Sequence, residues 1–168
     1  RSLFANDGLV NYVLVNLGIL DKPYNFLTQP FAAKMVILLG LLWRWTGYNM
    51  VFFLSGLQNI EYSVYEAAKI DGASAIQTFF KITVPLLKPT ILLTAIMSTN
   101  GTLQLFDESV NLTDGGPANA SISMSHYIYN LCFKYVPNFG YAAAMSFFIL
   151  LLVAVLAFIQ MRVGDKRD

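Results

Sequence analysis

Charged residues are scarce in this chain of 168 residues, since Asp, Glu, Lys and Arg together make up 12% of it. A soluble globular domain carries roughly 25%. The formal net charge of +1 argues against a nucleic-acid-binding protein, which needs a basic patch or stripe. Cys132 is the only cysteine and His126 the only histidine. An intrachain disulfide is therefore excluded, and neither a redox centre nor a metal site of cysteine and histidine is expected.

A secretion signal is also missing from the first residues. The run from Arg1 to Gly8 lacks the basic start, apolar core and small-residue cleavage site of a signal peptide. Hydrophobic residues, in contrast, are abundant: they make up 56% of the chain and give it a mean hydropathy of +0.55. This composition predicts a membrane protein.

Three apolar segments are long enough to cross a hydrocarbon layer of about 30 Å as helices. They cover residues 32–57, 90–106 and 141–161. The second is the shortest and has polar side chains along it, so we expect it to face something polar. Two shorter amphipathic helices are predicted over residues 8–20 and 121–135, from apolar residues that recur at helical spacing.

A polar stretch, residues 58–89, separates the first two spans and predicts a helix-turn-helix. Ser63 is expected to cap a helix over residues 63–70, with Glu66 three residues later completing a capping box. Gly72 permits a positive φ where that helix must turn.

A second short helix is expected over residues 73–81. Its apolar side chains fall on one side, where we expect them to pack on the membrane domain: Ile76, Phe79 and Phe80. A proline disfavours helix at the residue before it. Pro85 and Pro89 therefore predict a bend as the chain re-enters the membrane.

This stretch contains a spaced motif, Glu66-Ala67-Ala68, then Gly72 after three residues and Ile82-Thr83-Val84-Pro85 after nine more. It resembles the EAA signature of permease subunits in bacterial ABC importers, with Val84 in place of the usual Leu. Flanking runs resemble the carbohydrate-type branch of those permeases: Leu54 to Ile60, Asp71 to Ser74 and Leu112 to Pro117.

The resemblance implies an all-α membrane protein, the C-terminal part of a type I ABC importer permease fold. Its expected segments are an external loop with an interfacial helix (1–31), a transmembrane helix (32–57), the cytoplasmic EAA segment (58–89), a second transmembrane helix (90–106), an external loop with a short helix (107–140), a third transmembrane helix (141–161) and a cytoplasmic tail (162–168). Lys and Arg residues favour the same orientation, six on the cytoplasmic side against four outside. Such permeases have further helices upstream, so we expect a longer subunit.

The resemblance also implies a docking role for the EAA motif. The residues expected to contact the ATP-binding subunit are Glu66, Ala67, Ala68, Asp71 and Gly72, with Glu66 paired to a basic partner residue. The alternative is an amphipathic hairpin lying on the bilayer surface. Such a helix usually has a basic polar face, whereas this one carries Glu66 and Asp71.

Polar residues in the second span predict part of a substrate pathway. Asn100, Gln104 and Asp107 are spaced to share one helical face, where they could hydrogen-bond sugar hydroxyls. The alternative is hydrogen bonding between helices.

The first span carries Trp43 and Gly47, which form either a platform for a sugar ring or a site of aromatic packing. Arg44 beside them is expected to form a structural ion pair with Asp107 or Glu108, since an unpaired arginine within a span is costly.

By resemblance, then, the chain is a permease subunit of an ATP-driven sugar importer, working by alternating access in a bacterial cytoplasmic (inner) membrane with its C-terminus in the cytoplasm. It is expected not to be an enzyme and to hold no cofactor, because ATP and Mg belong to the ATPase. The implied partners are an ATP-binding subunit dimer, a second homologous permease, an extracytoplasmic sugar-binding protein, the sugar and lipid. The alternatives are a permease for an amino acid, peptide or phosphate, and an uncoupled channel or scaffold.

Overall fold

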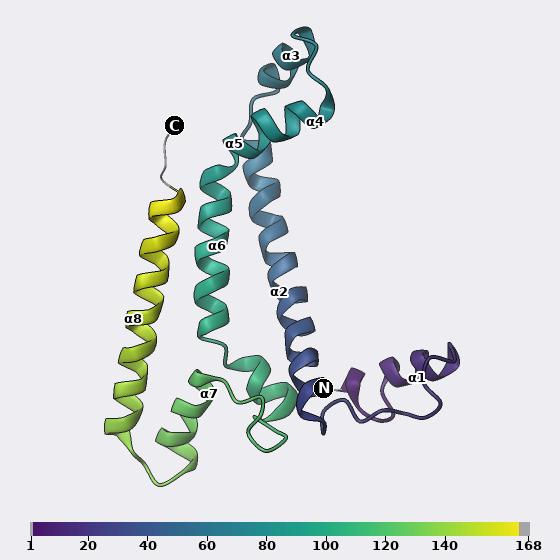
Figure 1. Ribbon diagram of the computed structural model, residues 1–168, viewed down its shortest axis with the longest axis vertical. Coiled ribbons are helices and arrows are strands. Elements are labelled where there is room, and N and C mark those ends of the chain that lie inside the picture. Colours follow the sequence, from purple (N-terminus) through teal and green to yellow (C-terminus); the bar gives the residue numbers. More distant parts are fainter. Residues whose placement is uncertain (1, 165–168) are drawn as a thin grey trace. The chain divides into compact units, whose positions relative to one another are not determined.

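The computed structural model describes residues 2–164, and the regular elements in that range are all helical (Figure 1). Helices α2 (Pro30–Gln58) and α8 (Phe139–Gly164) are each long and apolar enough to cross a membrane. A third candidate span is the bent pair Ala75–Leu86 and Lys88–Leu103, whose parts meet at 64°. The all-helical architecture with up to three spans agrees with the prediction from sequence.

The described chain divides into two compact units. One contains the chain up to Trp43 together with Gly101–Leu151, and the other contains Arg44–Asn100 and the chain from Leu152. The shorter elements of the first unit are η1 (Ser2–Phe4), α1 (Leu9–Asn16), η3 (Ser109–Thr113), α7 (Met124–Tyr129) and η4 (Asn130–Lys134). The second unit holds α3 (Tyr62–Ile70), α4 (Ala75–Thr78), η2 (Phe79–Thr83), α5 (Val84–Leu86) and most of α6 (Lys88–Leu103).

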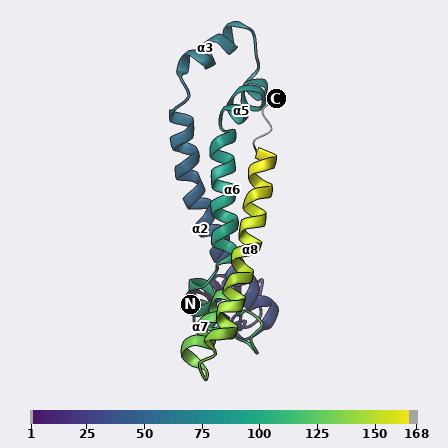
Figure 2. The same ribbon diagram turned by 90° about the vertical axis from the view of Figure 1, so that its left-hand side faces the viewer.

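In the second unit, the C-terminal part of α2 lies beside α6 (Figures 1 and 2). Asn49 and Ser98 exchange hydrogen bonds between these helices, at 3.2 and 3.3 Å. The helices approach closely at Gly56, where a Cβ would come within 2.9 Å of Thr90 Oγ1 of α6. Small and polar residues are typical of helix contacts in membranes, where lipid competes equally well for apolar side chains.

In the first unit, the start of α2 buries a face made largely of small and β-branched residues, Ala32, Ala33, Val36 and Ile37. Gly40 continues this face, and a Cβ there would lie 3.7 Å from a Leu112 methyl carbon. The opposite face of the same helical stretch exposes large apolar side chains. This is the pattern of a helix with protein on one side and lipid on the other.

The chain between α4 and α6 differs from the prediction. The expected helix over residues 73–81 is instead the short α4 followed by the π-helical η2. Pro85 lies in the first turn of α5, where its missing N–H is not needed. The predicted bend is confirmed, since it lies at Leu87, between Pro85 and Pro89. Val84 and Lys88, where the two prolines were expected to disfavour helix, are nevertheless helical.

Candidate functional site

Helix α3 carries the EAA motif and begins at Tyr62, with Glu61 in an extended conformation as its N-cap. Ser63 already lies within the helix, and its hydroxyl donates to Glu61 Oε2 at 3.3 Å. The predicted capping box between Ser63 and Glu66 is therefore wrong. Within the described residues, the first turn of α3 receives no side-chain cap.

The end of α3 is closed by a Schellman motif around Gly72. The Gly72 N–H donates to Lys69 O at 3.1 Å, and the Ala73 N–H donates to Ala68 O at 2.9 Å. This pair of bonds requires a left-handed residue after the helix, which Gly72 supplies with a φ of +74°. The turn predicted at Gly72 is confirmed.

A capping box follows immediately, at the start of α4. The Gln77 N–H donates to Ser74 Oγ at 3.3 Å, and the Ser74 N–H donates to Gln77 Oε1 at 2.9 Å. This box was missed from the sequence, although Ser74-Ala75-Ile76-Gln77 has its spacing. The turn of the EAA segment (residues 58–89) is thus fixed by a backbone cap at the end of α3 and a side-chain cap at the start of α4.

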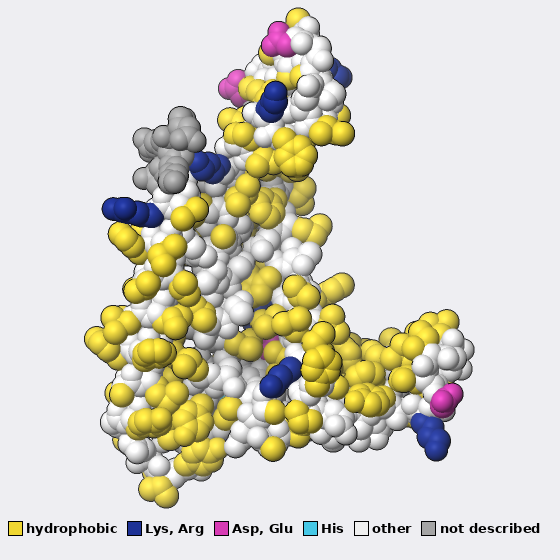
Figure 3. All heavy atoms as spheres, viewed as in Figure 1, with side chains coloured by type: hydrophobic (Ala, Val, Ile, Leu, Met, Phe, Trp, Pro, Cys, Tyr) yellow, Lys and Arg dark blue, Asp and Glu magenta, His cyan; other side chains and the backbone are white. Residues whose placement is uncertain are grey.

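The predicted docking residues differ in exposure. Glu66, Ala67, Asp71 and Gly72 are exposed, whereas Ala68 is only 5% exposed. Ala68 also accepts the Ala73 N–H, so it helps to hold the turn. Acidic and basic side chains lie among hydrophobic ones over this end of the unit (Figure 3).

A hollow of about 380 Å³ lies between α3 and the α4–η2 segment. The Thr83 hydroxyl donates to Thr78 O at 3.4 Å, so the Tyr65 hydroxyl is the donor in its 3.3 Å bond to Thr83 Oγ1. That bond ties α3 to η2 across the hollow. Lys69, Ala73, Ala75 and Phe79 complete the lining.

The apolar residues of the EAA segment are exposed on this chain. Ile70 is 86% exposed, and Ile76, Phe79 and Phe80 are also exposed. Phe79 and Phe80 contact each other edge to face, with ring centroids 5.0 Å apart. The expectation that Ile76 and the two rings pack on the membrane domain is therefore wrong for the described chain.

The predicted pathway residues are divided between the two units. Trp43, Gln104 and Asp107 belong to the first unit, and Gly47 and Asn100 to the second. Helix α6 ends at Leu103, so Asp107 does not continue its face and the predicted stripe is interrupted.

Around Gly47, a Cβ would meet no other described atom within 4 Å. The guanidinium carbon of Arg44 lies 5.4 Å from the Trp45 ring centroid. The sugar contacts expected of Trp43, Gly47 and the polar stripe stay predictions, as does the ion pair of Arg44.

A polar pair for which no site role was predicted connects α8 to α6. Gln160 of α8 donates from its amide nitrogen to Thr99 Oγ1 of α6 at 2.8 Å, within the second unit. The available signal was one amide within a strongly apolar helix, since polar residues inside spans usually face other helices.

The loop between α6 and α8 holds a buried histidine. His126 is fully buried, and its Nδ1 lies 2.9 Å from Ser109 Oγ. The Ser109 hydroxyl donates to Ser121 O at 2.8 Å, so its one proton is used and Nδ1 must be the donor in the bond to Ser109. His126 Nε2 consequently carries the lone pair of the neutral ring.

His126 Nε2 lies 3.7 Å from Asp114 Oδ1, and Lys134 Nζ donates to the same oxygen at 2.9 Å. Burial lowers the pKa of His126, the Asp114 carboxylate opposes that shift, and Lys134 adds to it. The neutral ring is therefore the stable form in this loop. No role was predicted for His126, and its partners are too distant in sequence for local spacing to indicate them.

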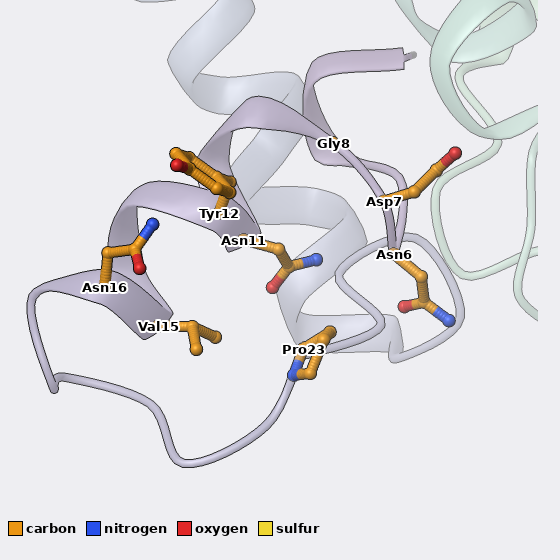
Figure 4. A pocket seen from close by; sticks show the side chains of 8 residues that line it. All are labelled: Asn6, Asp7, Gly8, Asn11, Tyr12, Val15, Asn16 and Pro23. Carbon is orange, nitrogen blue, oxygen red and sulfur yellow. The ribbon is translucent and has the colours of Figure 1, made fainter.

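A second hollow, of about 230 Å³, lies beside α1 (Figure 4). Asn11 points toward the loop that carries Pro23, and Tyr12 points outward. The Asn11 amide donates to Ala5 O at 2.9 Å and Tyr24 O at 3.0 Å, while its oxygen accepts the Tyr24 N–H at 2.8 Å. Asn11 therefore holds the chain together and is not available to a ligand.

Family comparison matches residues 8–167 to the binding-protein-dependent transport system inner membrane component family. The chain belongs to this family. The apolar helices α2 and α8, with the EAA motif between candidate spans, agree with membership in a family of inner membrane components.

This inner membrane component is 53% identical to the lactose transport system permease protein LacF of Rhizobium radiobacter, over 99% of the chain and 57% of LacF. It is similar to a chain in the crystal structure of a bacterial ABC transporter that imports the acidic polysaccharide alginate, with a TM-score of 0.79 and 25% identity over 94% of this chain and 54% of that one. A second structure, of the alginate transporter with an alginate pentasaccharide-bound periplasmic protein, has a TM-score of 0.69 and 26% identity over 94% and 53%. The chain thus spans about half the length of these relatives.

Proposed function

We propose that the chain forms part of a permease subunit of an ATP-driven, binding-protein-dependent sugar importer. The observation that carries the proposal is the EAA hairpin between two candidate spans, with an exposed outer face and a turn fixed by caps. The relative LacF is named for lactose transport, and both similar structures are of an alginate importer. Together they favour a carbohydrate over an amino acid, peptide or phosphate.

The EAA segment is proposed to dock on a separate ATP-binding subunit. Glu66, Ala67, Asp71 and Gly72 would contact that subunit, and the buried Ala68 would support them by holding the turn. The exposed Ile70 lies one helical turn after Glu66 and adds an apolar contact beside the charge. Hydrolysis, with its ATP and Mg, would take place on that partner, and this chain would act as a transport component without catalysis of its own.

The proposed orientation places residues 58–89 and the C-terminus in the cytoplasm and residues 107–140 outside a bacterial inner membrane. A second permease subunit would complete the pathway, and an extracytoplasmic binding protein would deliver the sugar. Trp43, Gly47, Asn100, Gln104 and Asp107 are the residues proposed to line that pathway. Their amides, carboxylate and indole have the chemistry that sugars require, namely hydrogen bonds to hydroxyls and a flat apolar surface for the ring.

The test of docking is Glu66→Lys in the full-length subunit, expressed with its partner subunits. We expect sugar uptake and co-purification of the ATP-binding subunit to be lost while the permease remains in the membrane. Glu61→Lys is the matched control, because Glu61 is an exposed acid at the other end of the same helix. Normal uptake by Glu66→Lys, or equal loss in both variants, would contradict the docking role.

A further inference from the structure

Helix α1 buries a polar residue and exposes apolar ones, the opposite of a surface helix in a soluble domain. Asn11 is the residue buried on its inner side, at 1% exposure, and it is satisfied there by Ala5 and Tyr24. The outer side presents Tyr12 and Leu17, at 69% and 67% exposure, together with Leu9 and Val13. These four residues, of which Leu17 is the C-cap, recur at helical spacing on one face, which we call the α1 apolar face. The exposed Asn16 at the end of the helix lies on the same face.

The α1 apolar face belongs to a firmly built arm, residues 2–28. Asn11 joins three parts of it through two donated bonds and one accepted bond. Edge-to-face contacts of the Phe26 ring with Phe4 and Tyr24 close the same fold, with centroid separations of 6.1 and 5.1 Å. The outward direction of the apolar face is therefore set by internal contacts.

The arm leads directly into the apolar span α2, and both lie in the first unit. At the start of α2, the face opposite the buried one exposes Phe31, Leu38, Leu39 and Leu42. Hydrophobic side chains extend from the foot of α2 onto the arm, and charged side chains lie at its lower tip (Figure 3). The α1 apolar face thus continues a surface that is already suited to lipid.

The length and chemistry of α1 suit the boundary of a bilayer. Its eight residues span about 12 Å, far short of a hydrocarbon layer of about 30 Å. Leucine and valine can enter the acyl region while the Tyr12 hydroxyl remains at headgroup level, as aromatic residues do at membrane interfaces.

We propose that the arm lies in the membrane interface at the N-terminal end of α2, with the α1 apolar face immersed in lipid and the charged tip in water. The partner of this surface is the lipid bilayer. The proposal depends on α2 spanning a membrane, and it is independent of which solute is carried and of the docking role of the EAA segment.

The test measures the depth of spin labels in the full-length subunit, assembled with its partners in vesicles of phosphatidylcholine and phosphatidylglycerol. In a Cys132→Ser background, nitroxides are attached to Tyr12→Cys and Leu17→Cys on the α1 apolar face and to Lys22→Cys as the control within the same arm. Collisions with oxygen, which enters lipid, and with a water-soluble nickel chelate are then compared. Val13→Cys provides a further site on the same face if one variant does not assemble.

We expect the ratio of oxygen to nickel collisions to be several-fold higher at residues 12 and 17 than at residue 22. Nickel collisions as frequent at residues 12 and 17 as at residue 22 would overturn the proposal, because the face would then be in water. Low collision rates with both reagents at residues 12 and 17 would also overturn it, because a protein surface and not lipid would then cover the face.

Discussion

The two polar segments that separate the helical spans are held together in opposite ways. In the EAA segment, residues 58–89, the turn is fixed by a Schellman motif and a capping box, and the charged residues Glu66 and Asp71 remain exposed. In the His126 loop, residues 107–140, Ser109 and His126 are themselves buried and bonded to each other. The EAA segment therefore leaves charged side chains available to a partner, whereas the His126 loop uses polar side chains to hold its own shape.

Because buried side chains hold the His126 loop together, we expect the substitution with the largest loss of stability to lie in this loop. His126→Ala should destabilise the subunit by about 3 kcal/mol, since it creates a cavity and removes the shorter of the two hydrogen bonds that Ser109 Oγ accepts. Thermal unfolding of the purified complex measures the change. Co-purification of the ATP-binding subunit at low temperature should be retained, because the EAA segment is untouched. Loss of that subunit without loss of stability would break the comparison.

The next largest effect is expected at the turn of the EAA segment. Gly72→Ala places a Cβ at a φ of +74°, which costs roughly 1 to 2 kcal/mol for an L-residue in the left-handed region. Gly18→Ala is the matched control, since Gly18 has a φ of +69° and its Cβ would also meet no described atom within 4 Å. Both variants should lose similar stability, but only Gly72→Ala should reduce ATPase-coupled uptake. Equal uptake by the two would contradict the role assigned to the turn.

The spans and the position of the EAA segment could be predicted from sequence because both depend on local properties. A long and mostly apolar segment indicates a span, and a glycine directly after a helix indicates its C-cap, without knowledge of distant contacts. The N-cap of α3 was misplaced because Ser63 is a good capping residue by type, yet the chain turns into the helix one residue before it. The box at Ser74 had the required spacing and could have been found.

Other features depend on contacts that spacing does not reveal. The partners of His126 are 12 and 17 residues away along the chain, at Asp114 and Ser109, and only the folded loop brings them together. The stripe from Asn100 to Asp107 failed because α6 ends at Leu103, where the sequence has neither proline nor a capping glycine at the boundary. The π-helical turns follow no simple periodicity of apolar residues.

A smaller effect is expected from the capping box that starts α4. Ser74→Ala removes the acceptor for the Gln77 N–H and should cost about 1 kcal/mol. Ser74→Asp retains an acceptor and should restore the helix start. Since Ser74 shapes the turn without being a predicted docking residue, the alanine variant should bind the ATP-binding subunit more weakly and the aspartate variant normally. Equal binding by both would show that the cap does not set the docking geometry.

The smallest effect is expected from protonation of His126, because no atom is removed. Burial lowers the pKa of His126 in the folded chain below its ordinary 6.5. Between these two values the unfolded chain binds more protons than the folded one, so stability should fall as the pH falls through 6.5 towards the folded pKa. At lower pH the added proton goes to Nε2, facing Asp114, while the Nδ1 bond to Ser109 persists.

Thermal unfolding from about pH 8 to pH 5 should show this loss of stability, and the His126→Gln variant should lack it. If His126→Gln lost as much stability between about pH 8 and pH 5 as the unchanged chain, the pH dependence would come from the carboxylates. His126 would then act in the loop by its shape and hydrogen bond alone.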